Sequence, residues 1–271
     1  MQVDKILVGR RTDASTMGSY ALADEIASMP STELLAPLSR VLFPAFVNVA
    51  NDPEKLRSAF SKAIGVQSLV ALPAAVGLYM IAADAVLLLL GERWQQAIPL
   101  VQTLALMSLF SALTYAGSYL LLALGKVSVQ AVLSWLRLGL LAFLAIIIFP
   151  EAGAQEIANI RLGTTALGFV LFGALVLHYV ETLRLSDFLK HTWRSISSTA
   201  IMAFALAVFP KIDALALFAQ VILSIAVGAG VYACSILLLW RISGCSEGAE
   251  PYLLEQIGIK GKFLKWMRVA E

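Results

Sequence analysis

Charged residues are scarce in this 271-residue sequence: Asp, Glu, Lys and Arg make up 14% of it, against about 25% in a typical soluble domain. Hydrophobic residues make up 59%, and the mean hydropathy is +0.83. This balance excludes an ordinary soluble domain and predicts an all-α polytopic membrane protein. The formal net charge of +2 is too small to indicate nucleic acid as a partner.

Residues that carry catalytic and metal chemistry are equally sparse. The two cysteines, Cys234 and Cys245, give neither a disulfide framework nor a metal-ligand spacing, and the histidines, His178 and His191, are isolated. No phosphate-binding glycine loop, nucleotide fingerprint or nucleophile motif is present in the sequence. We therefore expect no enzymatic activity, no metal and no cofactor. The first residues also lack a basic, apolar leader, so we expect membrane insertion through internal segments.

Long apolar runs are what the sequence has in abundance. About 20 mostly apolar residues span a bilayer as a helix. Seven stretches are candidates: 17–43, 64–90, 97–124, 127–149, 162–180, 195–209 and 214–240. The sixth is short for a span, so we expect it to borrow residues from both sides.

Three polar segments separate or follow these stretches. In the first, Asp52 can cap a helix that begins at Pro53. Its apolar residues share one face, which is typical of a helix at the membrane surface: Leu56, Phe60 and Ile64. We expect a polar loop at 181–194. The tail mixes basic and apolar residues in "IKGKFLKWMRVAE", which favours contact with anionic lipid over a solvated, frayed end.

The distribution of basic residues predicts the orientation. If the chain alternates sides along seven spans, thirteen of the 20 Lys and Arg residues share one side, six lie on the other, and Arg137 lies within a span. The richer side is expected to be cytoplasmic, together with the C-terminus. The opening run "VDKILVG" has the composition of the end of a further apolar span, so we expect polypeptide before Met1.

The first long stretch, "SYALADEIASMPSTELLAPLSRVLFPAF", combines an apolar composition with the ionisable residues Asp24, Glu25, Glu33 and Arg40. A charge at mid-membrane costs about 2.5–3.5 kcal/mol on insertion scales. Glu25, Glu33 and Arg40 fall on one stripe, and seven residues place Glu33 about 10.5 Å from Arg40 along the helix, too far for a direct pair. We therefore expect the stripe to face water or a partner helix and not lipid.

Two prolines interrupt the same stretch. Pro30 and Pro37 leave backbone carbonyls without helical partners, which is tolerated where protein or water is near. We predict that this helix bends and lines a hydrated cavity. Its four ionisable residues are then candidates for contact with a substrate or a coupling ion, proton or sodium, with Glu33 and Asp24 as the coupling candidates. Structural pairing against a neighbouring span is the alternative.

Arg137 is a further candidate, near the middle of the stretch 127–149. A guanidinium at this depth can bind the pyrophosphate of a lipid-linked sugar, because its planar fork matches phosphate oxygens. The alternative is a structural ion pair, with Asp84 or with an acid on another part of the protein.

Two segments carry a family resemblance. "DKILVGRRTDASTMGSYALADEIASMP" and "LSRVLFPAFVNVANDPEKLRSAF" resemble the C-terminal half of polysaccharide and lipopolysaccharide biosynthesis flippases, the Wzx-type polysaccharide transporters of the multidrug/oligosaccharidyl-lipid/polysaccharide (MOP) superfamily. The matching features include Asp4, Gly18, Tyr20 and Pro30, and the short loops "LLGERW" and "LALGKVS" are similar to loops of that family. The resemblance covers most of residues 1–180.

The resemblance implies a MOP/MATE-like helical bundle and the translocation of undecaprenyl-pyrophosphate-linked oligosaccharide across the bacterial inner membrane. Residues 1–181 would form the C-terminal transporter lobe, 182–241 a cytoplasmic loop and two additional spans, and 242–271 a basic cytoplasmic tail. The N-terminal lobe would be supplied by preceding sequence, which makes this chain a fragment, or by a separate chain; a truncated gene that lacks this lobe is the third alternative. Lipid-linked oligosaccharide and membrane lipids are the expected partners. In that family the cavity is formed chiefly by other spans than the one that carries Arg137. The resemblance therefore does not favour Arg137 as a substrate-binding residue.

Two other functions are compatible with parts of the sequence. A drug or cation antiporter of the same superfamily would share the bundle, but would tend to lack the "NDPEKLRSAF" segment. A non-catalytic membrane subunit of a polysaccharide assembly system would show a polar cluster at one membrane face, which the sequence does not predict.

Overall fold

The computed structural model describes residues 3–180, 182–210 and 216–243, except for the side chains of residues 31, 36, 37 and 39. Within these ranges the chain is helical, with no strand. The tail at 244–271, with Cys245, lies outside the described residues, so its predicted lipid contact stays a prediction. The prediction of an all-α membrane protein is confirmed.

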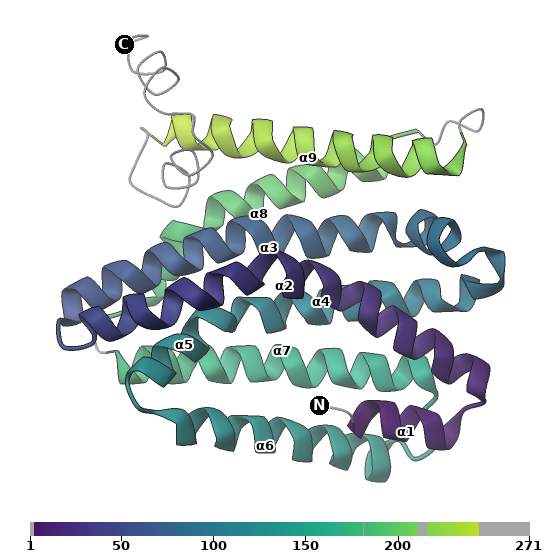
Figure 1. Ribbon diagram of the computed structural model, residues 1–271, viewed down its shortest axis with the longest axis horizontal. Coiled ribbons are helices and arrows are strands. Elements are labelled where there is room, and N and C mark those ends of the chain that lie inside the picture. Colours follow the sequence, from purple (N-terminus) through teal and green to yellow (C-terminus); the bar gives the residue numbers. More distant parts are fainter. Residues whose placement is uncertain (1–2, 181, 211–215, 244–271) are drawn as a thin grey trace.

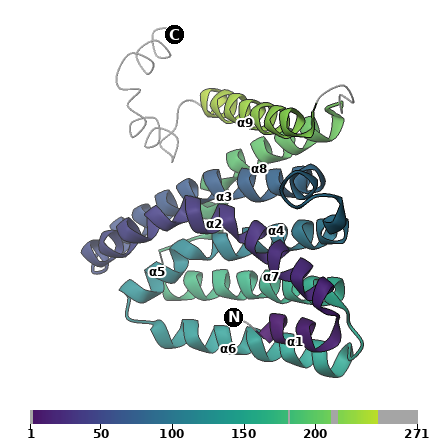
Figure 2. The same cartoon turned by 45° about the vertical axis from the view of Figure 1, so that its right-hand side comes forward.

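The helices run side by side as one bundle, with α6 at one edge and α8 and α9 at the other (Figures 1 and 2). In chain order the elements are α1 (Val3–Arg11), α2 (Ala14–Val49), α3 (Pro53–Leu90), the 3₁₀ turn η1 (Glu92–Ala97), α4 (Ile98–Leu113), α5 (Tyr115–Ala123), α6 (Val127–Phe143), the π-helical turn η2 (Leu144–Ile148), α7 (Ala154–Tyr179), α8 (Leu185–Val208) and α9 (Leu217–Ile242).

Five of the seven predicted spans are long and apolar enough to cross a membrane, judged over the part of the chain that the structure describes. They are Pro53–Leu90, Glu92–Ala123, Val127–Ile148, Ala154–Tyr179 and Leu217–Ile242. The other two predicted stretches fall in α2 and α8, which are helical but are not among these five. The multi-pass architecture is therefore established, whereas the count of seven spans stays a prediction.

The helix start predicted at Asp52 is confirmed, since its side chain accepts a hydrogen bond from the N–H of Lys55 at 3.2 Å and Pro53 opens α3. The prediction of a separate helix at the membrane surface is wrong. Residues 53–90 form one helix of 38 residues, about 57 Å long. Its first apolar residues are buried against α2, α5 and α7, because that face meets protein instead of the membrane surface: Leu56, Phe60 and Ile64.

The predicted polar loop at 181–194 is also wrong for most of its length, because α8 begins at Leu185. Asp187 stabilises this start by accepting a hydrogen bond from the N–H of Arg184 at 3.0 Å. The guanidinium of Arg57 in α3 donates two hydrogen bonds to the same carboxylate, at 3.0 and 2.8 Å. These contacts, chiefly the Arg57 bond, hold the pKa of Asp187 below its usual value. The segment predicted to be a loop is therefore mostly helical, and Arg57 of α3 binds the acid at its start.

The buried core is divided into two blocks along the helices. The first block joins the N-terminal part of α2, with Tyr20 and Ala27, to α1, α4 and the start of α7. The second block joins the C-terminal part of α2, with Leu42 and Phe46, to α3, α5 and the end of α7. α2 belongs to both blocks and changes direction near its middle (Figure 1). The assignment of this bend to Pro30 and Pro37 stays a prediction; Pro30 is half-buried, and the side chain of Pro37 lies outside the described residues.

Candidate functional site

Three helices bring ionisable side chains together at one point, which we call the ionic cluster: Asp4, Lys5, Tyr20, Asp24 and Arg161. Nη1 of Arg161 lies 2.7 Å from Oδ2 of Asp4 and 2.8 Å from Oδ1 of Asp24. Nζ of Lys5 lies 2.9 Å from the other oxygen of Asp24. The hydroxyl of Tyr20 donates to Asp4 at 3.0 Å and accepts from Arg161 at 3.3 Å. α1, α2 and α7 are thus joined through one arginine.

The cluster is largely removed from solvent and balanced in charge. The side chains of Asp4, Asp24 and Arg161 are 3%, 15% and 17% exposed, and Tyr20 is fully buried. Two carboxylates face one guanidinium and one ammonium, so the formal charges cancel. Because an unpaired charge at this depth is costly, the mutual pairing is what allows four charges to lie inside the bundle.

Local sequence explains why these side chains meet. Tyr20 and Asp24 are four residues apart, so they lie on the same face of α2. Asp13 fixes the start of that helix by accepting hydrogen bonds from the N–H groups of Ser15 and Thr16, at 3.1 and 3.4 Å. α1 buries its apolar residues in the first core block and so holds its acid and lysine against α2. For Asp24, the structure therefore shows pairing with neighbouring helices.

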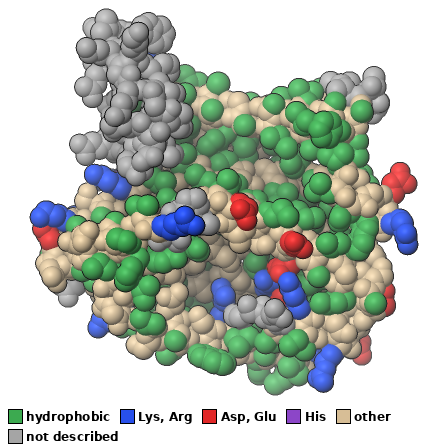
Figure 3. Space-filling view, viewed as in Figure 1, with side chains coloured by type: hydrophobic (Ala, Val, Ile, Leu, Met, Phe, Trp, Pro, Cys, Tyr) green, Lys and Arg blue, Asp and Glu red, His purple; other side chains and the backbone are tan. Residues whose placement is uncertain are grey.

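The other three charged candidates of α2 lie on a different face, which we call the outward stripe: Glu25, Glu33 and Arg40. All three are exposed. Nine residues separate Asp24 from Glu33, which places them on opposite sides of the helix. Large apolar residues accompany them on this surface: Met29, Leu34 and Val41, which are 50%, 52% and 58% exposed. Figure 3 shows acidic and basic side chains gathered around a hollow on this face of the molecule.

Arg137 belongs to neither group, although it lies close enough to Arg161 of the ionic cluster for the two positive charges to interact. It is half-buried and packs against α7 at Gly168, where an added Cβ would come within 3.3 Å of the Cδ of Arg137. It lines a small cavity of about 140 Å³ together with four polar side chains: Thr114, Ser118, Gln130 and Ser134. The arrangement places a guanidinium beside polar groups and near the middle of the span, as expected, but not in the ionic cluster.

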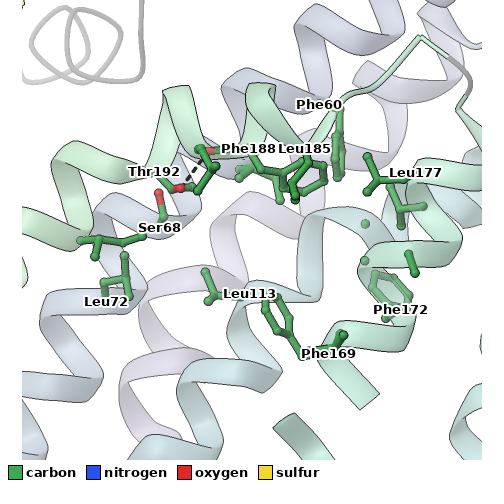
Figure 4. A pocket seen from close by; sticks show the side chains of 18 residues that line it. Phe60, Ser68, Leu72, Leu113, Phe169, Phe172, Leu177, Leu185, Phe188 and Thr192 are labelled. Carbon is green, nitrogen blue, oxygen red and sulfur yellow. Dashed lines mark hydrogen bonds between the residues drawn. The ribbon is translucent and has the colours of Figure 1, made fainter. Parts of the chain in front are cut away.

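A larger cavity, of about 530 Å³, lies between α3, the α4–α5 segment, α7 and α8 (Figure 4). Phe60, Phe172, Phe188 and Leu177 point into it, and nearly all of its lining is apolar. Thr192 is one of its few polar side chains, and its hydroxyl is bonded to the carbonyl of Phe188 at 2.7 Å. The sequence did not predict this cavity, because the segment that closes it was expected to be a loop.

Sequence reasoning missed two cations of the ionic cluster, Lys5 and Arg161, and used Asp4 and Tyr20 only as marks of family resemblance. Arg161 lies just before the stretch expected to span the membrane, where a basic residue is usually a loop residue. The spacing of Tyr20 and Asp24 was a signal that could have indicated a polar face. Over the described residues, no group of three or more His, Cys, Asp or Glu side chains gathers at a metal-binding distance.

The sequence of residues 1–99 matches a family described as "Polysaccharide biosynthesis protein". The lipopolysaccharide biosynthesis protein WzxC of Escherichia coli K12 is 34% identical over 125 residues, 46% of this chain and 25% of that protein. The teichuronic acid biosynthesis protein TuaB of Bacillus subtilis is 26% identical over 240 residues, 88% of this chain and 49% of that protein. The chain thus spans about half or less of the length of these curated relatives.

Among solved structures, the lipid II flippase MurJ in an inward closed conformation has a similar fold. The two superpose with a TM-score of 0.70 at 16% sequence identity, over 89% of this chain and 51% of that one. At this identity the match shows the fold alone, a bundle of helices of which five are long and apolar enough to span a membrane over the described residues. Together with the sequence matches, it confirms the predicted resemblance of this chain to the polysaccharide biosynthesis flippases of the MOP superfamily.

Proposed function

We propose that this chain is the C-terminal half of a flippase that moves undecaprenyl-pyrophosphate-linked oligosaccharide across the bacterial inner membrane during polysaccharide biosynthesis. The observation that carries the proposal is the outward stripe of α2, which presents Glu25, Glu33 and Arg40 on the surface of an otherwise apolar bundle. A charged side chain within the hydrocarbon region of a membrane must face water or protein. A hydrated cavity shared with a second lobe satisfies that requirement.

The second lobe is the main partner in this proposal, supplied by preceding sequence or by a separate chain. The relatives support it, since this chain accounts for about half of the length of TuaB and of MurJ. The two lobes would rock about the cavity in an alternating-access cycle. Residues 1–181 form the transporter lobe, 182–241 the additional spans, and 242–271 a cytoplasmic tail.

The outward stripe suits the polar part of such a substrate. Arg40 binds pyrophosphate oxygens, because guanidinium groups donate paired hydrogen bonds to them. Glu25 and Glu33 accept hydrogen bonds from sugar hydroxyls. The protein moves its substrate without changing a covalent bond, so it is a transporter and not an enzyme. Arg137 remains a second phosphate-binding candidate, beside the structural role that its contact with α7 supports.

Ion coupling is assigned to Glu33 in this proposal. Asp24 was the other candidate, but Lys5 and Arg161 already pair with both of its oxygens. An acid with two cationic partners is held in its ionised form, whereas an exposed acid in a cavity can exchange a proton or bind sodium.

Flipping by the complete gene product in proteoliposomes tests the proposal, with fluorescent undecaprenyl-pyrophosphate oligosaccharide as the substrate. The double variant E33Q/R40Q is expected to lower the flipping rate at least about tenfold, the effect of losing one charge-assisted hydrogen bond. E92Q/R93Q is the matched control, because Glu92 and Arg93 are also exposed but lie in the turn between α3 and α4.

Two results would refute the proposal. One is an unchanged flipping rate in E33Q/R40Q, which would remove the stripe from the transport path. The other is transport of an organic cation without any flipping of the lipid-linked sugar, which would establish the drug or cation antiporter instead.

A further inference from the structure

The apolar segment that contains α4 and α5 is interrupted near its middle. α4 ends at Leu113 and α5 begins at Tyr115, and the ribbon changes direction between them (Figures 1 and 2). Proline does not explain the break, since Pro99, in the first turn of α4, is the only proline in residues 98–123. Other sharp bends arise where a side chain is inserted into the backbone hydrogen-bond ladder.

Gln67 of α3 makes such an insertion. In an unbroken helix the N–H of Ala116 would donate to the carbonyl of Ala112, four residues earlier. Here the N–H of Ala116 donates to Oε1 of Gln67 at 2.9 Å, and Nε2 of Gln67 donates to the carbonyl of Ala112. One side-chain amide therefore stands between the two partners of a backbone hydrogen bond and satisfies both. We call this arrangement the amide bridge.

Two hydroxyl groups reinforce the break. Thr114 donates to the carbonyl of Ser111 at 2.7 Å, and Ser118 donates to the carbonyl of Thr114 at 3.0 Å. Hydrogen bonds of this type bend helices, because they compete with the backbone ladder. Gln67 itself is 1% exposed, so its amide depends on the two backbone partners that it separates.

The amide bridge lies between the two core blocks. α4 contributes to the first block and α5 to the second, whereas α2, α3 and α7 contribute to both. A small third group of buried residues joins α2, α3 and α4 between them: Leu35, Ala71 and Ala112. Ala71, which α3 contributes to this third group, lies one helical turn after Gln67. The break in α4–α5 therefore lies at the boundary between the two blocks.

We propose that the α4–α5 break is a two-state hinge, that Gln67 is its positioning residue, and that α5 moves on it against α7 during transport. The bent state is the one described here. In the straight state, Ala116 donates directly to Ala112 and the buried amide of Gln67 loses both partners. This loss favours the bent state by about 5–150-fold, which corresponds to about 1–3 kcal/mol. Both backbone groups are bonded in either state, as the interior of a membrane requires. The role in transport rests on the proposed function, whereas the two states do not.

Movement of α5 would alter both cavities. Gly117 lines the apolar cavity, and Ser118, the next residue, lines the polar cavity beside Arg137. α5 also packs closely against α7, since an added Cβ at Gly117 would lie 2.5 Å from a ring carbon of Phe172. Straightening the segment must therefore shift α5 along α7 and change the shape of both spaces.

The size of the movement follows from helix geometry. α5 has nine residues and is about 13.5 Å long. Removing a bend of about 20°, the lower limit of a sharp kink, moves its far end by about 5 Å. A displacement of this size is measurable between two spin labels.

The test uses the complete gene product in nanodiscs, with spin labels at Leu122 of α5 and Leu238 of α9. These residues are 40% and 60% exposed, and α9 lies across the bundle from α5, so the distance between the labels follows a sideways movement of α5 (Figure 1). Q67L is expected to shift the distance distribution by about 5 Å, because the backbone bond then closes directly. Q102L is the matched control: Gln102 also bonds from α4 to α3, to the carbonyl of Tyr79 at 3.5 Å, but away from the break.

Q67E provides a second variant that decides the matter even if Q67L fails to fold. A protonated glutamic acid offers one donor and one acceptor and can rebuild the amide bridge, whereas the carboxylate cannot donate to Ala112. Q67E is therefore expected to match the wild type at low pH and to shift as the pH rises. A Q67E that is already shifted at low pH, an unshifted Q67L, or an equal shift in Q102L would overturn the hinge.

Flipping measured in the same samples separates the two proposals. A shifted distance in Q67L with a wild-type flipping rate would refute the role of the hinge in transport. Absence of flipping in the wild type would refute the proposed function, and the distances would still decide whether the hinge exists.

Discussion

The ionic cluster provides the most demanding test of the physical reasoning. Replacing Arg161 with methionine removes the group that contacts both Asp4 and Asp24, at 2.7 and 2.8 Å. Among the described residues, Asp4, whose side chain is 3% exposed, would keep only the hydroxyl of Tyr20 as a partner. Removing one partner from a buried ion pair costs about 3–5 kcal/mol. Since the total stability of a protein is about 5–15 kcal/mol, R161M is expected to be severely destabilised.

The same reasoning predicts that a second substitution repairs much of the damage. D4L/R161M removes one acid and one base and leaves the pair of Asp24 with Lys5, which are 2.9 Å apart. It also removes both partners of the buried Tyr20 hydroxyl, which costs about 1–3 kcal/mol and makes the repair incomplete. Replacing a whole buried ion pair with apolar residues is often neutral or stabilising. The double variant is therefore expected to be more stable than R161M, so that the two effects are strongly non-additive.

Thermal unfolding in a fixed detergent measures both effects. The loss in R161M corresponds to a fall in Tm of roughly 6–20 °C, at about 2–4 °C for each kcal/mol. R10M is the control, because Arg10 is an exposed arginine of α1 outside the cluster. A fall of less than about 2 °C in R161M, or a D4L/R161M double variant less stable than R161M, would refute the account of the cluster.

Three further predictions concern other parts of the chain. In a cysteine-free background, E33C is expected to react with a water-soluble maleimide in the complete gene product, whereas A27C, on the buried face of α2, is not; equal labelling would contradict the outward stripe. The lowered pKa of Asp187 means that its ionised form stabilises the folded state above its ordinary pKa of about 4, and that this contribution is lost as the pH falls through the lower, folded value. The acid sensitivity of Tm should therefore be smaller in D187N, and an unchanged pH profile would show that Asp187 does not contribute. G117A is expected to cost about 1–3 kcal/mol, because its Cβ would meet the ring of Phe172, and F172L should relieve the loss; urea or thermal unfolding of both variants measures this, and a fully stable G117A would contradict the close packing.

The sequence by itself determined which segments are helical and apolar and where several of them begin. Composition and runs of apolar residues are local properties, and they predicted the membrane class and helices at all seven expected stretches. The start of α3 was also readable, because Asp52 and Pro53 act on the helix that immediately follows them. The family resemblance and the charged character of α2 were likewise present in contiguous residues.

The tertiary structure alone decided which charged side chains form ion pairs inside the bundle and which are exposed on its surface. Asp24 and Glu25 are neighbours in sequence, yet one binds Arg161, 137 residues away, and the other is exposed. The start of α8 depends in the same way on Arg57, 130 residues before Asp187, and the break in α4–α5 on Gln67. The spacing of apolar residues predicts which face of a helix is buried, but it does not predict which helix packs against that face. Such contacts are fixed only when the helices pack, because a buried charge or amide must then be bonded by whichever group the fold places beside it.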